Sequence, residues 1–124
     1  MAVNYTTAVK NARLDAVTTA AGTTAVLEIG TSAMGTVLAT IALGNPIAAG
    51  ASGGILTLSG FPRSDTSADN TGTAAAARIR TASGGTDIVT GLTVGTSGSD
   101  INLDSVSITA GQTVTISSAT ITHA

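Results

Sequence analysis

The sequence predicts a mainly β protein: a β-sandwich or jelly-roll-like domain of about seven antiparallel strands, preceded by one N-terminal helix. Residues 6–21 contain no Gly or Pro and space their apolar residues as a helix does. From Gly22 onward, short alternating runs are separated by Gly, Ser, Asn and Asp. A second helix that could connect parallel strands is missing from the pattern, so a parallel α/β sheet is not expected.

The first 22 residues are expected to form an N-terminal arm and an amphipathic helix. Asn4 or Thr6 can cap the helix, and Gly22 can end it with a positive φ angle. The apolar positions form one stripe and an adjoining one: Val9, Ala12, Ala16 and Ala20, then Leu14, Val17 and Ala21. Because most of these side chains are single methyl groups, such a helix is marginal by itself and needs a surface to pack on.

Residues 23–124 are expected to form a single β-sandwich domain. Alternation of apolar residues with outward-facing Thr and Ser predicts strands at 24–29, 36–43, 54–59, 73–81, 87–94, 101–109 and 112–123. Gly111 stands where a tight hairpin needs a positive φ angle. Shifts in apolar parity predict a bulge near Ser117 and Ser118, and a bulge or kink at Asp104 and Ser105.

Composition indicates a folded chain with a thin core and little catalytic equipment. Thr, Ala, Gly and Ser make up 72 of the 124 residues, and only 27 are Val, Ile or Leu. Such a chain should gain stability from a partner or from self-association. The absence of Cys excludes a cysteine nucleophile, a disulfide framework and a thiolate metal site. With one His and no nucleophile elbow, we expect no enzyme and no cofactor.

Charge and hydropathy exclude two further classes of partner. The net charge is −2 with five basic residues, which is not the clustered basic surface that nucleic acid requires. Apolar runs stay well short of the roughly 18 residues of a membrane span. The first residues also lack the basic and apolar regions of a signal peptide, which favours a protein made in the cytoplasm.

The longest polar loop, residues 60–72, is the most plausible place for a contact or a ligand. Asp65, Asp69 and Asn70 favour capping of turns, with a Ca²⁺ site as the alternative. Phe61 is either a core plug or an anchor inserted into a neighbouring subunit. Arg78 and Arg80 share one face of a strand, which is either solvated or an interface. The candidate interface residues are Tyr5, Val9, Arg13, Phe61, Arg63, Asp65, Asp69, Arg78 and Arg80.

Several segments resemble small virion structural proteins of tailed bacteriophages. These are the opening MAVNYTTAVKNARLDAV, then VLEIGT, GFPRSDTSADNTGTA, GLTVGTSGSDINLD and SITAGQTVTI. The resemblance covers nearly the whole chain and carries no catalytic residue. It implies a β-rich capsid decoration (cement) protein on the exterior of the virion, with the major capsid protein as its partner and a homotrimer as its favoured assembly.

Composition agrees with that class, since small side chains lose little entropy when they pack against a neighbour. In this hypothesis, copies bridge adjacent capsid subunits through residues 1–21 and through the loop from Phe61 to Asn70. The alternatives are a tail or fibre component and a carbohydrate-binding β-sandwich module. The scarcity of aromatic residues, one Tyr and one Phe with no Trp, weighs against the sugar-binding alternative.

Overall fold

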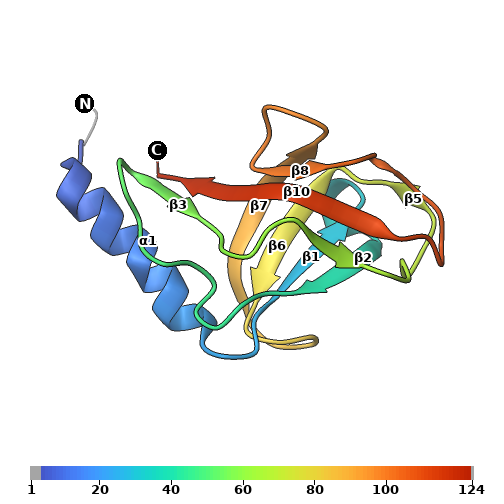
Figure 1. Cartoon of the computed structure of the whole chain (residues 1–124), viewed down its shortest axis with the longest axis horizontal. Coiled ribbons are helices and arrows are strands. Elements are labelled where there is room, and N and C mark those ends of the chain that lie inside the picture. The colour runs from blue at the N-terminus through green and yellow to red at the C-terminus, as the bar shows by residue number, and fades with distance from the viewer. Residues whose placement is uncertain (1–3, 124) are drawn as a thin grey trace.

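The chain begins with helix α1, Thr7–Ala21, which packs against one end of a strongly curled β-sheet (Figure 1). This computed structural model describes residues 4–123. The first three residues of the predicted N-terminal arm, and Ala124 at the end of the predicted β domain, lie outside the described residues. Both ends of the described chain lie at the same end of the molecule (Figure 1).

A short 3₁₀ turn, η1 (Ser32–Met34), and ten strands follow the helix. The strands are β1 (Val26–Gly30), β2 (Val37–Ala42), β3 (Ile55–Thr57), β4 (Arg63–Asp65), β5 (Gly72–Thr73), β6 (Ala76–Arg80), β7 (Asp87–Gly95), β8 (Ile101–Leu103), β9 (Ser107–Ile108) and β10 (Val114–Thr122). The main sheet has the order β2-β1-β6-β7-β8-β10-β3, with β4 also paired to β10. Strands β5 and β9 form a separate two-stranded ribbon.

The expected mainly β class and single N-terminal helix are confirmed, but the predicted set of antiparallel strands is wrong for one pair. Strands β7 and β8 run parallel, with Val94 opposite Ile101. The short connection between them is held closed by Asp100 and Thr93, since each backbone N–H donates to the other residue's side chain at 3.0 Å. The result is a curled mixed sheet, a half-barrel, and the two stacked sheets of a sandwich are not confirmed.

Helix α1 is capped as expected but presents a different face to the sheet. The Thr6 side chain accepts a hydrogen bond from the Val9 N–H, and Gly22 ends the helix with φ 68°. Leu14 and Ala21 are buried and Val17 is partly buried. The predicted main stripe, Val9, Ala12, Ala16 and Ala20, instead faces solvent. That prediction is wrong because the other side of the helix carries the larger residues Leu14 and Val17 and also the hydrogen bonds that Asn11 and Asp15 make to the following segment.

Two polar side chains of α1, Asn11 and Asp15, connect the helix to the segment that follows β2. Asn11 Oδ1 accepts a hydrogen bond from the Gly54 N–H at 2.9 Å, and Asp15 Oδ1 accepts one from the Ala51 N–H at 2.8 Å. These bonds satisfy two backbone donors of an irregular segment, which otherwise have no strand partner. They also fix the rotation of the helix.

Most predicted strands are present, and two of them are divided. The predicted strand 73–81 is interrupted between β5 and β6, and the predicted strand 101–109 breaks between β8 and β9 at the predicted kink, Asp104 and Ser105. The predicted bulge in β10 is confirmed by a shift of register against β8 between Ile116 and Ser118. Gly111 has the expected positive φ angle, 86°.

The predicted loop 60–72 is not wholly irregular, since it contains β4 and the first residue of β5. Strand β4 pairs with residues 114–116 of β10. The residues after it reach across to β2: Asp65 Oδ2 accepts from the Thr40 N–H, and the Asp69 N–H donates to the Leu38 carbonyl at 2.7 Å. The Asn70 side chain donates to the Val37 carbonyl at 2.8 Å. We call residues 65–70 the seam segment, because they join β2 to the β10 side of the half-barrel.

The core inside the curled sheet is aliphatic. Its fully buried large side chains come from every part of the sheet: Leu27, Ile29, Leu38, Ile41, Ile47, Leu56, Ile79, Ile101, Ile108, Ile116 and Val114. Phe61 is partly buried and packs against this cluster, which favours the core-plug alternative for that residue. The sheet is therefore filled by branched aliphatic residues, as the composition requires.

The hydrogen bond between the Thr40 N–H and Asp65 in the seam segment should contribute to stability. Asp65→Ala should lower the free energy of unfolding by about 1–3 kcal/mol, because it leaves the partly buried Thr40 N–H without an acceptor. Urea unfolding measures the change. Asp104→Ala is the control and should cost less than about 0.5 kcal/mol, since that exposed carboxylate accepts only from the adjacent Ser105 N–H. Equal losses in the two variants would contradict a bridging role for Asp65.

Because α1 buries one apolar stripe and exposes the other, substitutions in the two stripes should lower stability by different amounts. Leu14→Ala should cost about 2–4 kcal/mol of unfolding free energy, because Leu14 is 4% exposed. Val9→Ala should cost less than about 0.5 kcal/mol, because Val9 is 44% exposed. Urea unfolding measures both free energies. A larger loss for Val9→Ala than for Leu14→Ala would show that α1 packs its other stripe against the sheet.

Candidate interaction surface

The structure divides the predicted interface residues among three places. Tyr5, Val9 and Arg13 lie together at the start of α1. Phe61, Arg63, Asp65 and Asp69 lie on or next to β4 and the seam segment. Arg78 and Arg80 lie on β6. These groups differ in what their side chains contact, and only the first leaves large apolar side chains exposed.

The first group belongs to a surface that we call the terminal patch: Tyr5, Val9 and Ile55, bordered by Lys10, Arg13 and His123. Among residues 4–123, the exposed large hydrophobic side chains are Tyr5, Val9 and Ile55, at 43, 44 and 41% exposure. Tyr5 lies between Arg13 and His123, and Val9 is one helical turn from Arg13 on the outer side of α1. Ile55 is paired with Thr122, and the next residue, His123, donates its N–H to the Gly54 carbonyl at 2.9 Å.

Ring contacts hold the polar border of the terminal patch in place. The Arg13 guanidinium carbon lies 4.5 Å from the centre of the Tyr5 ring, which is a cation–π distance. The His123 ring meets the Tyr5 ring nearly edge-on, with 5.7 Å between their centres. The Lys10 stem lies against Gly54, where an added Cβ would be 3.6 Å from the Lys10 Cδ. The patch therefore combines apolar side chains with cationic groups on a rigid frame.

Sequence reasoning found Tyr5, Val9 and Arg13 but missed Ile55 and His123. The signal for Ile55 was present in the alternation of the predicted strand 54–59. Leu56 and Leu58 are buried, so Ile55 falls on the outward side. His123 could not be placed in this way, because only the pairing of β10 with β3 brings it to Tyr5.

The second group of predicted residues is engaged with its own chain. Asp65 accepts from the Ser67 N–H as well as from the Thr40 N–H, and Asp69 accepts from the Thr40 hydroxyl. The Arg63 side chain donates to the carbonyls of Ser59 and Ala42 at 3.2 and 3.4 Å, and its guanidinium lies over the Phe61 ring. These contacts connect β2, the Phe61 turn and β4.

The expected capping of a turn is seen for Asp65, whereas Asp69 accepts from the Thr40 hydroxyl on β2. The Asp65 contact with the Ser67 N–H is an Asx turn. Within the described part of the chain, no group of three or more His, Cys, Asp or Glu side chains is placed to hold a metal ion. Asp65 and Asp69 therefore act here as hydrogen-bond acceptors for β2.

The third group forms an ion-pair ladder across three strands. Arg78 Nε lies 2.6 Å from Glu28 Oε1 on β1, directly opposite it in the antiparallel register. Arg80 Nη1 lies 3.8 Å from the same oxygen, and Arg80 Nε lies 2.8 Å from Asp87 Oδ1 on β7. The shared face predicted for the two arginines is confirmed, and both are largely covered, with about a fifth of each side chain exposed.

Comparison with protein-family models, with curated proteins and with solved structures found no match to this chain. Across residues 4–123, none of the helical segments has the length and apolarity needed to cross a bilayer.

The ion-pair ladder predicts unequal roles for its two carboxylates. Glu28→Gln should lower the free energy of unfolding by about 1–3 kcal/mol, since it leaves two largely covered arginines with less compensating charge. Asp87→Asn should cost less than about 1 kcal/mol, because the Asp87 side chain is 42% exposed and water screens the pair. Urea unfolding compares the two. A larger loss for Asp87→Asn would reverse this ranking.

Proposed function

We propose that this chain is a non-enzymatic structural protein of a phage particle, which decorates the capsid and stabilises it by bridging adjacent major capsid subunits. The observation that carries the proposal is the terminal patch. Its three exposed large hydrophobic side chains lie at the same end of the molecule, Tyr5 and Val9 beside Arg13 and Ile55 beside the strand end that leads to His123. A clustered apolar surface with a polar border is typical of a protein contact site.

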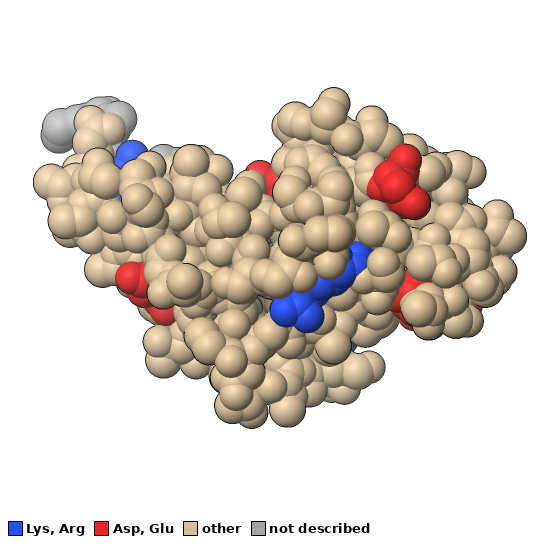
Figure 2. Space-filling view, in the orientation of Figure 1, with Lys and Arg blue, Asp and Glu red and all other residues tan. Residues whose placement is uncertain are grey.

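The rest of the surface supports an assembly role. Figure 2 shows a face on which acidic and basic side chains are few and widely separated. Small side chains such as Ala, Ser and Thr have little rotamer freedom to lose when a neighbour covers them. A surface of this kind suits permanent packing in a particle better than a transient encounter steered by charge.

The charges of the terminal patch indicate the kind of capsid surface that it fits. Lys10 and Arg13 border the patch, and the described residues place no salt bridge on either of them. We therefore expect the facing capsid surface to combine apolar side chains with Asp or Glu. Each bridging copy adds buried area at a seam between subunits, and this area must be lost before the subunits separate under internal pressure.

Self-association completes the proposal. A trimer places three terminal patches around one axis and so reaches three capsid subunits, which suits a threefold position on the lattice. If the chain belongs to a tail or fibre instead, the terminal patch would make the same kind of contact with a different partner protein. The position of the chain on the particle separates the two.

Particles provide the test of the decoration function. Particles that lack the protein should release their genome at a lower temperature than complete particles, and adding the purified chain back should restore the difference. Val9→Asp should weaken binding to stripped particles by at least about tenfold, because it replaces one of the exposed apolar side chains of the patch with a charge. Ser83→Asp, which adds the same charge to an exposed position in the turn between β6 and β7, should bind normally.

Localisation decides between the assembly roles. A reconstruction of the native particle should show the chain on the capsid exterior at threefold positions. Unchanged release temperature without the protein would overturn the stabilising role, and density only on the tail would replace it with the tail or fibre alternative.

A further inference from the structure

Helix α1 adds little apolar surface to the core of the half-barrel. It lies beside β3 and β7 at one end of the curled sheet (Figure 1). Its buried residues are Leu14 and Ala21, and Val17 is partly buried. Among the described residues, the large side chains that are fully buried lie between Leu27 and Ile116, all outside the helix. The sheet therefore encloses most of its core without α1.

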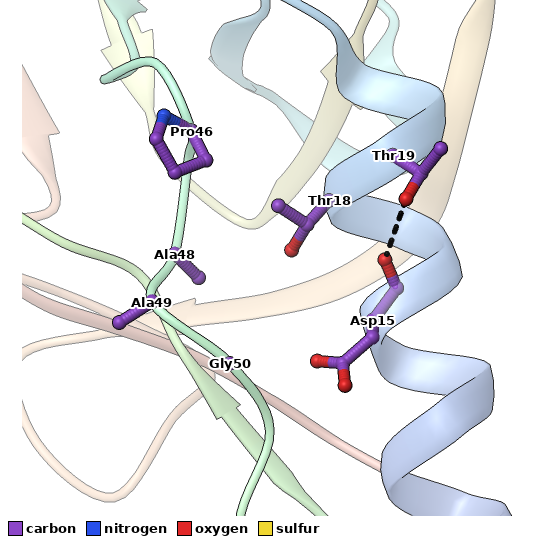
Figure 3. A pocket seen from close by; sticks show the side chains of 7 residues that line it. All are labelled: Asp15, Thr18, Thr19, Pro46, Ala48, Ala49 and Gly50. Carbon is purple, nitrogen blue, oxygen red and sulfur yellow. Dashed lines mark hydrogen bonds between the residues drawn. The ribbon is translucent and has the colours of Figure 1, made fainter.

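The contact between α1 and the segment that follows β2 is incompletely packed. A groove of about 260 Å³ lies between the helix and residues 46–50. The Thr18 side chain points toward this segment (Figure 3), and its hydroxyl oxygen is buried with no hydrogen-bond partner among residues 4–123. Burying a hydroxyl without a partner costs free energy each time the helix docks, because the hydroxyl loses its bonds to water.

Two hydrogen bonds oppose that cost and hold the helix in place. Asn11 Oδ1 accepts from the Gly54 N–H at 2.9 Å, and Asp15 Oδ1 accepts from the Ala51 N–H at 2.8 Å. Each bond joins a side chain of α1 to the backbone of the segment between β2 and β3. Docking of α1 therefore depends on a small difference between opposing contributions.

The connection from α1 to β1 provides a short hinge. No backbone hydrogen bond joins α1 to a strand within the described part of the chain. Gly22 ends the helix with φ 68°, and the next fixed side chain is Thr24, whose hydroxyl donates to the Thr81 carbonyl at 2.9 Å. Ala25 is buried. Rotation about Gly22 and Thr23 can thus move the helix while β1 stays in the sheet.

Docking of α1 also assembles the terminal patch from two halves. Tyr5 and Val9 belong to the helix and the residues just before it, whereas Ile55 and His123 belong to the edge of the sheet. The contact between the Tyr5 and His123 rings, at 5.7 Å between centres, joins the halves. If α1 leaves the sheet, this contact is lost and the apolar side chains of the patch separate.

We propose that α1 docks and undocks as a unit while the half-barrel stays folded, and that the terminal patch exists only in the docked state. The undocked state is the minor one, with about 0.1–1% of the molecules. A partner that contacts both halves of the patch binds only the docked state and shifts the equilibrium toward it. The undocking rests on contacts within the chain, whereas its consequence for a capsid partner rests on the proposed function.

Amide hydrogen exchange of the full chain, followed by NMR at increasing urea concentrations, tests the undocking. Amides at the centre of α1 should be protected about 100- to 1,000-fold, and at least about tenfold less than amides in β1 and β6. Ala51 and Gly54 are the decisive reporters, because their N–H groups donate to side chains of α1. Their protection should match that of the helix centre within about threefold, with the same dependence on urea.

Two valine variants test the cost of the buried hydroxyl. Thr18→Val replaces the unpartnered hydroxyl with a methyl group and should raise the protection of the helix centre and of the Gly54 amide by at least about threefold. Thr19→Val is the matched control, because Thr19 points away from the facing segment (Figure 3). It should change the same protection by less than about twofold.

A disulfide that locks α1 in the docked state connects the motion to the terminal patch. The natural chain has no Cys, so Asp15→Cys with Ala51→Cys introduces a single pair. Oxidation should raise the protection of the helix centre at least about tenfold over the reduced form of the same variant. The oxidised form should also bind stripped particles at least as tightly as the reduced form, since it keeps the patch assembled.

Three results would overturn the proposal. Equal protection of α1, β1 and β6 would show that the helix leaves the sheet only when the whole chain unfolds. Exchange at the helix centre that Ala51 and Gly54 do not follow would show that α1 frays in place. Weaker particle binding by the oxidised variant would contradict the assignment of the patch to the docked state. Absence of particle binding by both forms and by the unaltered chain would instead overturn the proposed function, and the exchange results would stand.

Discussion

The fold depends on joining β2 to the far side of a curled sheet. Strand β2 is at one edge of the main sheet, so the backbone groups on its outer side have no strand neighbour and need other partners. The seam segment supplies them, through the Asp65 carboxylate, the Asp69 N–H and the Asn70 amide. An unpaired edge of this length would expose a template for pairing with other chains. The short polar side chains of residues 65–70 thus do part of the work that a further strand would do.

A second requirement is that the interior be filled without aromatic residues. Branched aliphatic side chains from both ends of the sheet meet inside it, for example Leu27 with 0% and Ile116 with 0% exposure. Helix α1 contributes chiefly Leu14 and Ala21, and hydrogen bonds from Asn11 and Asp15 add to its attachment. A helix held in this way keeps its outer face open, and that face begins at the terminal patch.

The two ends of α1 have different charged groups. Near its start, the Arg13 guanidinium lies against the Tyr5 ring, and Val9 is exposed one turn before Arg13. Further along, the Asp15 carboxylate points toward the loop after β2 (Figure 3) and accepts from the Ala51 N–H. The cationic side chain therefore belongs to the outer surface of the helix, and the carboxylate belongs to its attachment.

The sequence by itself determined the class of the fold and many of its local features. Helix capping by Thr6, the turn at Gly111, the bulge in β10 and the kink after β8 follow from short-range preferences, which act within a few residues. The tertiary structure decided the parallel pairing of β7 with β8, the rotation of α1 and the bridging by Asp65. It also brought Ile55 and His123 to Tyr5. Each of these depends on which distant backbone groups lack partners and which apolar faces meet, and a pattern of neighbouring residues holds no record of either.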